Sequence, residues 1–372
     1  MVVKKLFTAI TLFCVECPVY GINRKGTMEG LMNDANIMRL IDEKGQYNFG
    51  AYENYIETMN PLDLKQGLWR FAPKFVKDKR LKEWHAYMIG GLDYYILVAA
   101  MDLKFFSILK VMVYDKNKNH TFGTSQIIPF KKIKLSKNLI DDSVYVCEGS
   151  TKIFSNHLLG DNKLELGFSF EDEMSGIQVS AFFESACGMN PPQVSVLPMK
   201  NAGGFYTSKH LMSLQGKLLI GNQEVRLKLN ETSMILDDQK VYYPYLTKWD
   251  WATASGIVGE DYCGFTVSDV RGLKDNLNEN AFWKNGNLHK LPNVRFCRNK
   301  SSGYWSIVDE MGLVNVSFKP VAKHVIRRNF GLASADYEGP FGWYSGHLTS
   351  LEGETLHVNG MFGMGEKLKM RL

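Results

Sequence analysis

The chain has 372 residues, which is enough for two or three hydrophobic cores because domains usually contain roughly 100 to 200 residues. Hydrophobic residues make up 45% of the sequence and charged residues 22%, values that exclude a largely disordered chain. The formal charge of +5 is spread along the sequence without a basic arm, so we do not expect a nucleic-acid partner.

The six cysteines form no pattern that predicts disulfides or a metal site. Cys14 and Cys17 make a lone C-x-x-C motif without a second pair, and the other four lie far apart. Buried free thiols in a reducing compartment are therefore the simpler interpretation.

The first residues have the outline of a signal peptide, since two lysines precede an apolar run over residues 6–15. Glu16 and Pro18 interrupt this outline, and no small-x-small cleavage site follows. We therefore expect a cytoplasmic protein and keep export through this segment as the alternative. No other stretch reaches the roughly 20 apolar residues of a transmembrane helix, so no integral membrane segment is expected.

Residues 1–39 are expected to form an N-terminal extension that carries a short helix. Apolar residues recur at helical spacing between residues 23 and 45, with Thr27 in the N-cap position and Gly45 at the end. Such a helix would pack as a plug or lid on the domain that follows.

The pattern changes to strands from Trp84 onward. Residues 94–100 and 108–114 are apolar runs of strand length. Residues 164–170 and 177–182 alternate between apolar and polar side chains, which predicts a hairpin with one buried face.

A Pro-Pro pair at residues 191–192 interrupts any regular element, so we place a domain boundary near it. The first domain then covers residues 40–200 and the second covers residues 201–372. The second half has the same pattern of short strands and turns as the first, because Gly221-Asn222 and Asn285-Gly286 are turn signatures between short strands. Many short strands with regular turns predict a mainly β protein with two successive antiparallel β-barrels.

Several motifs along the chain carry a resemblance to a known family. They are LIDEKG (40–45), RLKEWHAY (80–87), YTSKH (206–210), TKWDWATASG (247–256), NENAFWKNGNLHKL (278–291), FKP (318–320) and GMGE (363–366). Together they resemble the bacterial domain-of-unknown-function family 2804, in order, over residues 40–372. The resemblance implies a pair of lipocalin-like barrels, similar to those of carotenoid hydratases, tocopherol cyclases and fungal Diels-Alderases. It implies no particular activity.

One segment departs from the family pattern. Similar sequences carry an Asp followed by a Gly-Arg-Gly-like turn, whereas this chain has DDQKVYYP at residues 237–244. Lys240 then stands in place of the arginine and Val241 in place of the glycine. The change removes a bidentate guanidinium and a flexible backbone position.

Motifs for other chemistries are missing. Residues 360–367 resemble a P-loop, but Glu366 stands where the phosphate-binding lysine is required. The sequence has no G-x-S-x-G nucleophile motif, and its eight histidines show neither H-x-H nor H-E-x-x-H spacing. We therefore expect no metal and no cofactor.

Residues 206–251 combine a lysine flanked by hydroxyl groups, a tight hairpin, two adjacent carboxylates and a tyrosine-tryptophan cluster. We therefore expect a pocket there. We take Asp237 and Glu366 as candidate catalytic acids, and as candidate ligand-binding residues Lys209, Lys240, Tyr243, Trp249, Trp251, Asn280 and Trp283. In a strand, Tyr243 and Tyr245 would share one face, and so would Trp249 and Trp251. The alternative is that these rings fill a barrel core. For Asn280 and its neighbour Glu279, a structural hydrogen-bonding role is equally compatible with the sequence.

Asp237 and Asp238 are adjacent, so in an extended chain they point to opposite sides and only one is expected to face inward. An inward aspartate would need a cation such as Lys209, Lys240 or Lys248. The alternative is a pair of turn aspartates in a solvated loop.

Three functional hypotheses remain. The first is binding of a small hydrophobic molecule, lipid-like or isoprenoid-like, in a barrel or between the barrels. The second is a cofactor-independent hydratase, cyclase or isomerase acting on an apolar polyene or polyketide-like substrate. There a protonated Asp237 or Glu366 would protonate an alkene, and aromatic faces would stabilise the cation. The third is a structural scaffold that presents an apolar surface to another protein.

Overall fold

The computed structural model describes residues 39–91, 93–129, 133–186, 190–199, 203–229, 231–270, 277–331 and 333–371. The chain divides into two compact units, Met1–Asn36 and Ile37–Leu372, and all described residues belong to the second. Most of the predicted N-terminal helix, the signal-like segment and the C-x-x-C motif lie outside the described residues. Where the predicted helix overlaps them it is wrong, because residues 39–45 form isolated bridges and a turn in which Gly45 has a φ of +80°.

Short helical segments and strands of the first sheet occupy the chain up to Val241. The helical segments are η1 (Pro61–Asp63), η2 (Gly67–Arg70), α2 (Lys74–Arg80) and η3 (Leu159–Asp161). The strands are β1 (Gly50–Tyr52), β2 (Lys82–Gly90), β3 (Tyr94–Asp102), β4 (Phe106–Asp115), β5 (His120–Pro129), β6 (Asp142–Glu148), β7 (Thr151–Leu158), β8 (Lys163–Glu171), β9 (Gln178–Ala186), β10 (Gln193–Met199), β11 (Gly203–Ile220), β12 (Gln223–Leu227) and β13 (Ser233–Val241).

The first sheet is antiparallel and curls around one hydrophobic core. Its hydrogen-bonded order is β5-β4-β3-β2-β13-β11-β9-β8-β7-β6, with β10 and β12 attached to β11 and β1 to β10. Strand β8 illustrates why it forms, because every second side chain is buried and the buried set, Leu164 to Phe170, joins the core. The predicted hairpin is confirmed, since β8 pairs with β9.

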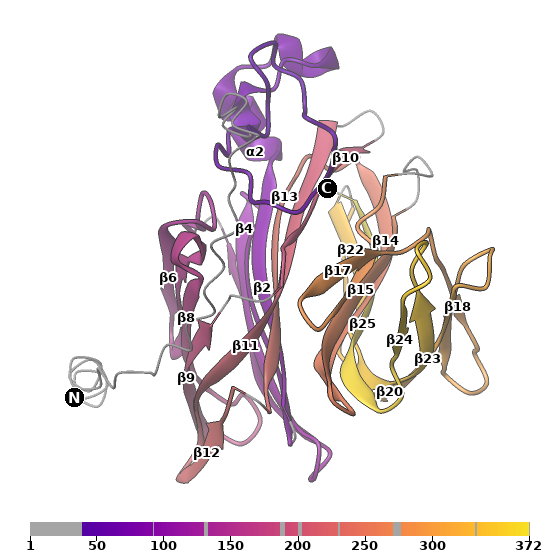
Figure 1. Ribbon diagram of the computed structural model, residues 1–372. Helices are drawn as coiled ribbons and strands as arrows, with labels where there is room; N and C mark the ends of the chain where they lie inside the picture. The colour runs from indigo at the N-terminus through magenta and orange to yellow at the C-terminus, as the bar shows by residue number, and fades with distance from the viewer. Residues whose placement is uncertain are drawn as a thin grey trace. The chain divides into compact units, whose positions relative to one another are not determined.

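The second sheet contains the rest of the chain. Its strands are β14 (Leu246–Val258), β15 (Asp261–Val270), β16 (Ala281–Lys284), β17 (Asn287–Lys290), β18 (Arg295–Arg298), β19 (Trp305–Val308), β20 (Val314–Ala322), β21 (Val325–Phe330), β22 (Ala333–Glu338), β23 (Phe341–Thr349), β24 (Thr355–His357) and β25 (Met361–Arg371). The order is β17-β16-β15-β14-β25-β23-β20-β19-β18, and it encloses a second core that includes Phe265, Val316 and Phe318. The chain is therefore a mainly β protein with two successive antiparallel barrel-like units (Figure 1).

The change from one sheet to the next falls between Val241 and Leu246, and not near residue 200. Strands β11 to β13, which the predicted boundary assigned to the second barrel, pair in the first sheet. The Pro-Pro pair only separates β9 from β10 within that sheet. A local chain breaker does not reveal to which sheet the next strand will add.

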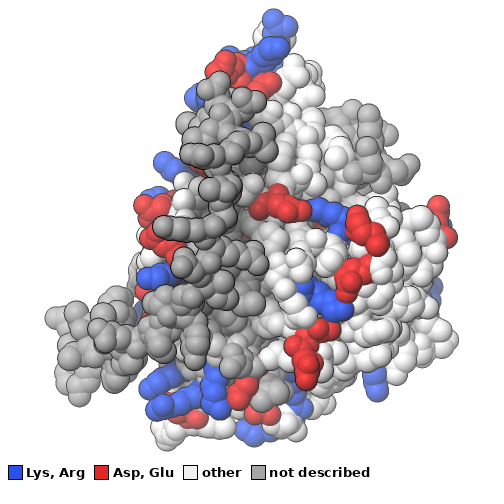
Figure 2. Space-filling model, viewed as in Figure 1, with Lys and Arg blue, Asp and Glu red and all other residues white. Residues whose placement is uncertain are grey.

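The two sheets share a buried layer. Met88, Tyr95 and Ile235 of the first sheet form one hydrophobic cluster with Trp251, Phe362 and other residues of the second. This layer exists because the central strand β13 buries both of its faces, with all nine residues buried. On the face shown in Figure 2, basic and acidic side chains are interspersed, and basic side chains reach the upper tip.

Candidate functional site between the two sheets

Strand β13 directs the adjacent Asp237 and Asp238 to opposite faces, and both are buried, with 4% and 0% of their surface exposed. As expected for adjacent residues, only one of them, Asp238, faces the core of the first barrel; Asp237 is buried as well because the other face of the strand is covered by the second sheet. The alternative of a solvated turn is wrong, because the strand continues to Val241. Each aspartate has its own cation.

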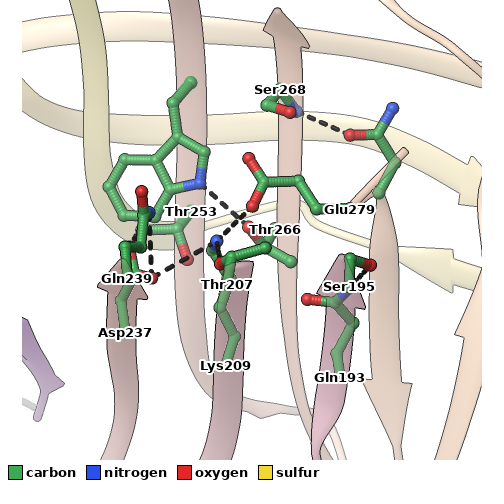
Figure 3. Close-up of polar contacts among 12 residues, drawn as sticks. Gln193, Ser195, Thr207, Lys209, Asp237, Gln239, Thr253, Thr266, Ser268 and Glu279 are labelled. Atoms are coloured by element: carbon green, nitrogen blue, oxygen red, sulfur yellow. Dashed lines mark hydrogen bonds and ion pairs between the residues drawn. The ribbon is translucent and has the colours of Figure 1, made fainter. Parts of the chain in front are cut away.

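Asp237 lies in a buried ionic network between the sheets (Figure 3). Lys209 is its direct partner in the register of β11 and β13, so the two side chains share a face, with Nζ 3.4 Å from Oδ1. The same ammonium donates to Thr207 Oγ1 at 2.8 Å and to Glu279, which lies just before β16 of the second sheet. Gln239 Nε2 lies 3.0 Å from both Asp237 carboxylate oxygens. The network thus joins the sheets through one lysine and two carboxyl groups.

The charges in this network shift one another's protonation. Burial by itself would lower the pKa of Lys209, but Asp237 and Glu279 outweigh it, so the pKa is raised and the ammonium stays charged. Burial raises the pKa of Asp237, and the Glu279 carboxylate adds to this, while Lys209 opposes it. Asp237 therefore holds a proton more readily than an ordinary aspartate.

Glu366 is the second acid of the inter-sheet layer. Its neighbour in β25, Gly365, faces the second core, where an added Cβ would lie 2.6 Å from the Trp305 ring. Glu366 therefore faces the opposite side, in register with Trp251 of β14. Trp249 Nε1 donates to Glu366 Oε1 at 3.3 Å. Burial raises the pKa of Glu366 to about 7, although Lys110 and the Trp249 hydrogen bond act in the other direction.

Aromatic rings stand beside this carboxyl group. Trp249 stacks on Tyr243, with ring centroids 5.4 Å apart, and on Trp84 at 6.1 Å. Trp84, Trp249 and Glu366 all keep part of their accessible surface, unlike the closed network around Lys209. The Glu366 carboxyl group is itself buried, but it belongs to a residue at a partly exposed part of the layer, beside aromatic faces.

Small side chains separate the charged ones on the first sheet. Across β4, β3, β2, β13 and β11, the residues directly opposite one another are Lys110, Ala99, Ala86, Asp237 and Lys209. Residues paired in this way share one face of an antiparallel sheet. The two alanines, which we call the alanine floor, therefore place only small side chains between two charged residues. Ala86 keeps part of its accessible surface.

The surroundings of Lys110 shift the pKa of its side chain. Burial lowers its pKa to about 8, and Glu366 opposes that shift. Its Nζ also lies 4.9 Å from the centre of the Tyr337 ring, a residue of β22 in the second sheet.

Five of the predicted site residues lie near one another in the inter-sheet layer, which also contains the fully buried Trp283, and Tyr243 stacks at its edge. The five are Lys209, Asp237, Trp249, Trp251 and Glu366. Trp251 donates its Nε1 hydrogen to Thr266 at 2.9 Å, and Lys209 Nζ lies 5.9 Å from its ring. Only Trp249 and Trp251 share a strand, because Tyr243 and Tyr245 lie in the connection between β13 and β14.

Three predicted ligand-binding residues have other partners. Lys240 lies on the opposite face of β13 from Asp237 and binds Asp238 at 3.0 Å. Asn280 accepts from the Ser268 backbone N–H and donates to the Pro292 carbonyl oxygen. Trp283 is fully buried and donates to the Pro191 carbonyl oxygen. These contacts hold strands and loops together.

Asp238 belongs to a separate polar cluster on the first barrel's core side. Besides Lys240, it lies 2.9 Å from His85 Nε2. Burial alone would raise the pKa of Asp238, but Lys240 and His85 outweigh it and lower the pKa. His157, whose ring centre is 5.1 Å from that of His85, has a lowered pKa because it is buried, and it contacts the Tyr87 hydroxyl at 2.8 Å.

Sequence reasoning missed several members of the site. Lys110 offered a signal, because a charged residue interrupts the apolar run of residues 108–114. The role of Glu279 as a partner of Lys209 had none, since 70 residues separate them. Trp84 and Gln239 likewise gain their places only from strand pairing.

Within the described residues, no group of three His, Cys, Asp or Glu side chains could hold a metal ion. The same part of the chain contains no helix that is long and apolar enough to cross a membrane. The P-loop-like stretch forms the start of β25.

Two barrel-like sheets that enclose an acidic and aromatic layer define a tandem β-barrel protein. The pattern of the family described as Domain of unknown function (DUF2804) matches residues 32–372, and the chain belongs to this family. The crystal structure of CghA with Sch210972 is similar at 9% identity and a TM-score of 0.53, covering 78% of this chain and 88% of that one. At this identity the likeness shows a shared fold.

A second similar structure is kievitone hydratase from Nectria haematococca, at 11% identity and a TM-score of 0.44, with 78% of this chain and 88% of that chain covered. A search of curated proteins finds no match.

Proposed function

We propose that this protein is a cofactor-independent acid–base catalyst that binds a small apolar molecule between its two sheets. Glu366 is the proton donor, and the reaction is of the hydratase, cyclase or isomerase type. The observation that carries the proposal is a carboxyl group with a pKa of about 7 that accepts a hydrogen bond from Trp249, a member of an aromatic stack.

A pKa near 7 suits this role because both protonation states are then populated at neutral pH. The protonated carboxyl of Glu366 gives its hydrogen to one carbon of a substrate double bond, forming a C–H bond and leaving a cation on the next carbon. The faces of Trp249 and Tyr243 stabilise that cation. Addition of water, or loss of a neighbouring proton, then neutralises it and returns one proton to the Glu366 carboxylate.

The other residues of the layer position the substrate. Ala86 and Ala99 are small, Ala86 keeps part of its accessible surface, and an apolar polyene or polyketide-like skeleton suits a floor of this kind. Lys110, at the end of the row away from the closed Lys209 network, can orient a polar group of the substrate. Asp237 is the alternative acid, since its pKa is also raised, but it is closed in by Lys209 and Gln239.

The barrel interiors are less suitable than the inter-sheet layer. Each is occupied by a cluster of buried aliphatic and aromatic side chains, including Val98 and Leu166 in the first and Phe265 and Val316 in the second. A binding protein without turnover would use the same inter-sheet layer, so turnover is what separates these two hypotheses.

The first experiment is native mass spectrometry of the protein purified from its host, followed by organic extraction. We expect a stoichiometric apolar molecule, which is lost in Trp249→Ala and retained in Trp343→Ala, an exposed tryptophan. An empty protein that also fails to bind apolar dyes would contradict the proposal and favour the scaffold hypothesis.

The second experiment incubates the extracted molecule with protein in deuterium oxide. An acid catalyst transfers one deuterium to carbon, whereas a binding protein returns the molecule unlabelled. We expect Glu366→Gln to abolish the labelling and to keep the ligand bound. Equal labelling by Glu366→Gln would exclude Glu366 as the donor.

A further inference from the structure

Large apolar side chains are exposed around η2 and α2. Leu68, Phe71 and Phe75 have 89%, 87% and 70% of their surface exposed. Phe105, in the turn between β3 and β4, is also exposed, and Lys79 and Lys82 lie over its ring. Exposed apolar groups gathered in this way mark a binding surface more often than isolated ones do.

The same segment is basic. Residues 61–83 contain seven lysines and arginines but only three acidic residues, so they hold four of the chain's five net positive charges. Arg70, Lys74 and Lys79 are exposed among the apolar side chains, although Lys74 pairs with Asp63 at 3.1 Å. We call residues 65–80 the basic-apolar tip. In Figure 2 basic side chains reach the upper end of the molecule, where Figure 1 shows α2.

The tip is held firmly on the first sheet. Tyr242, just after β13, donates its hydroxyl hydrogen to the Pro61 carbonyl oxygen at 3.2 Å, and Lys77 donates to the Leu64 carbonyl oxygen. The exposed side chains are thus presented by ordered backbone.

The tip also adjoins the candidate site. Arg80, the last residue of α2, donates to the Tyr243 carbonyl oxygen at 3.0 Å. Tyr243 stacks on Trp84 and Trp249, and Trp249 donates to Glu366. A continuous path of packed residues therefore connects the tip to the acid.

We propose that the basic-apolar tip docks on an anionic lipid bilayer. Aromatic and aliphatic side chains bind the interface between headgroups and acyl chains, while surrounding lysines and arginines attract anionic headgroups. The partner is a lipid surface because exposed apolar and basic residues alternate along this short segment. A second conclusion rests on the proposed function: the apolar substrate enters from the membrane, past Tyr243 and Trp84.

Vesicle co-sedimentation of the full chain tests the docking. The probes are vesicles of pure phosphatidylcholine and vesicles of equal parts phosphatidylcholine and phosphatidylserine. We expect binding to the anionic vesicles that weakens with added salt. Leu68→Ser/Phe71→Ser/Phe75→Ser should weaken it at least about tenfold, because the inserted apolar area is lost. The matched control, Tyr145→Ser/Met174→Ser/Met311→Ser, removes three exposed apolar residues elsewhere and should bind normally.

The outcomes separate docking from catalysis. Glu366→Gln should keep full vesicle binding, so loss of labelling with intact docking would bear only on the proposed function. Absence of wild-type binding, or equal loss in the control variant, would overturn the docking proposal. If the tip variant instead converts a dimer into a monomer in light scattering, the tip is a contact between copies of this chain and the proposal is wrong.

Discussion

Asp237 and Asp238 are neighbours on one strand, yet they belong to two different kinds of polar site. Asp238 lies on the core side of the first barrel, is fully buried, and has its pKa lowered by Lys240 and His85 despite the burial. Asp237 faces the second sheet and has a raised pKa, as does the nearby Glu366. A carboxyl group whose pKa is lowered in the folded state adds stability at neutral pH, whereas acids whose pKa is raised by burial cost stability there and suit proton transfer.

The largest expected effect comes from removing the cation between the sheets. Lys209→Met leaves Asp237 and Glu279 buried without their partner, which should cost about 3–5 kcal/mol in the free energy of unfolding. Urea denaturation measures this loss. Lys217→Met is the control, because Lys217 lies on the same strand with an exposed ion pair. A loss below about 1 kcal/mol would contradict a network that depends on Lys209.

The two aspartates should differ on substitution by asparagine. Asp238→Asn leaves Lys240 without its counter-charge and His85 without its carboxylate partner, and should cost about 3 kcal/mol at pH 7. Asp237→Asn should cost less, because burial raises the pKa of this carboxyl and so already makes its charged form less favourable. The lowered pKa of Asp238 contributes stability above its unfolded pKa, and this is lost as the pH falls through the folded value. Denaturation at pH 7 and pH 3 compares the pair, and equal costs at pH 7 would remove the distinction.

Glu366→Gln should stabilise the protein by about 2 kcal/mol at pH 8, because glutamine mimics the neutral carboxyl. The folded pKa of about 7 lies above the ordinary value of 4.5, so the carboxyl stabilises below pH 4.5 and loses this contribution as the pH rises through 7. Wild type and variant should therefore agree at pH 4 and differ at pH 8 in denaturation experiments. A destabilised variant at pH 8 would contradict the raised pKa.

Filling the alanine floor should affect binding more than folding. Ala86→Leu places extra carbon atoms over the first sheet, and we expect loss of apolar-dye binding with a change in unfolding free energy of about 1 kcal/mol or less. Fluorescence titration measures the binding. Unchanged dye affinity would show that the ligand does not use the space above Ala86.

The smallest effect is expected at the surface. Glu354→Gln removes the exposed ion pair with Lys284, whose atoms lie 2.7 Å apart, and should change stability by at most about 0.5 kcal/mol. The contrast with Lys209→Met tests whether burial, and not the contact distance, sets the energy of an ion pair. Thermal denaturation at low and high salt checks it.

Much of the fold could be predicted from sequence because local patterns encode it. The alternation in β8 and the Asn285-Gly286 turn, where Lys284 pairs with Asn287, appear as expected. The domain boundary could not be predicted in the same way. Which sheet β11 joins depends on pairing with β9 and β13, and no local pattern records those partners.

Part of the site could also be predicted, because some of its residues are close together in the sequence. Lys209 and Asp237 both lie within residues 206–251, and they are direct partners in the sheet. Lys240 does not face the inter-sheet layer, because residues three apart along a strand, such as Asp237 and Lys240, point to opposite faces. Glu279 could be recognised as a partner only once two distant strands were placed together.

Site-specific titration of Glu366 tests the central claim most directly. Carbon-13 NMR of glutamate-labelled protein follows each carboxyl group with pH, and comparison with Glu366→Gln assigns the resonance. We predict a pKa of about 7 that changes when an apolar molecule binds beside Trp249. A titration at the ordinary glutamate value of 4.5, unaffected by any apolar molecule, would contradict the account.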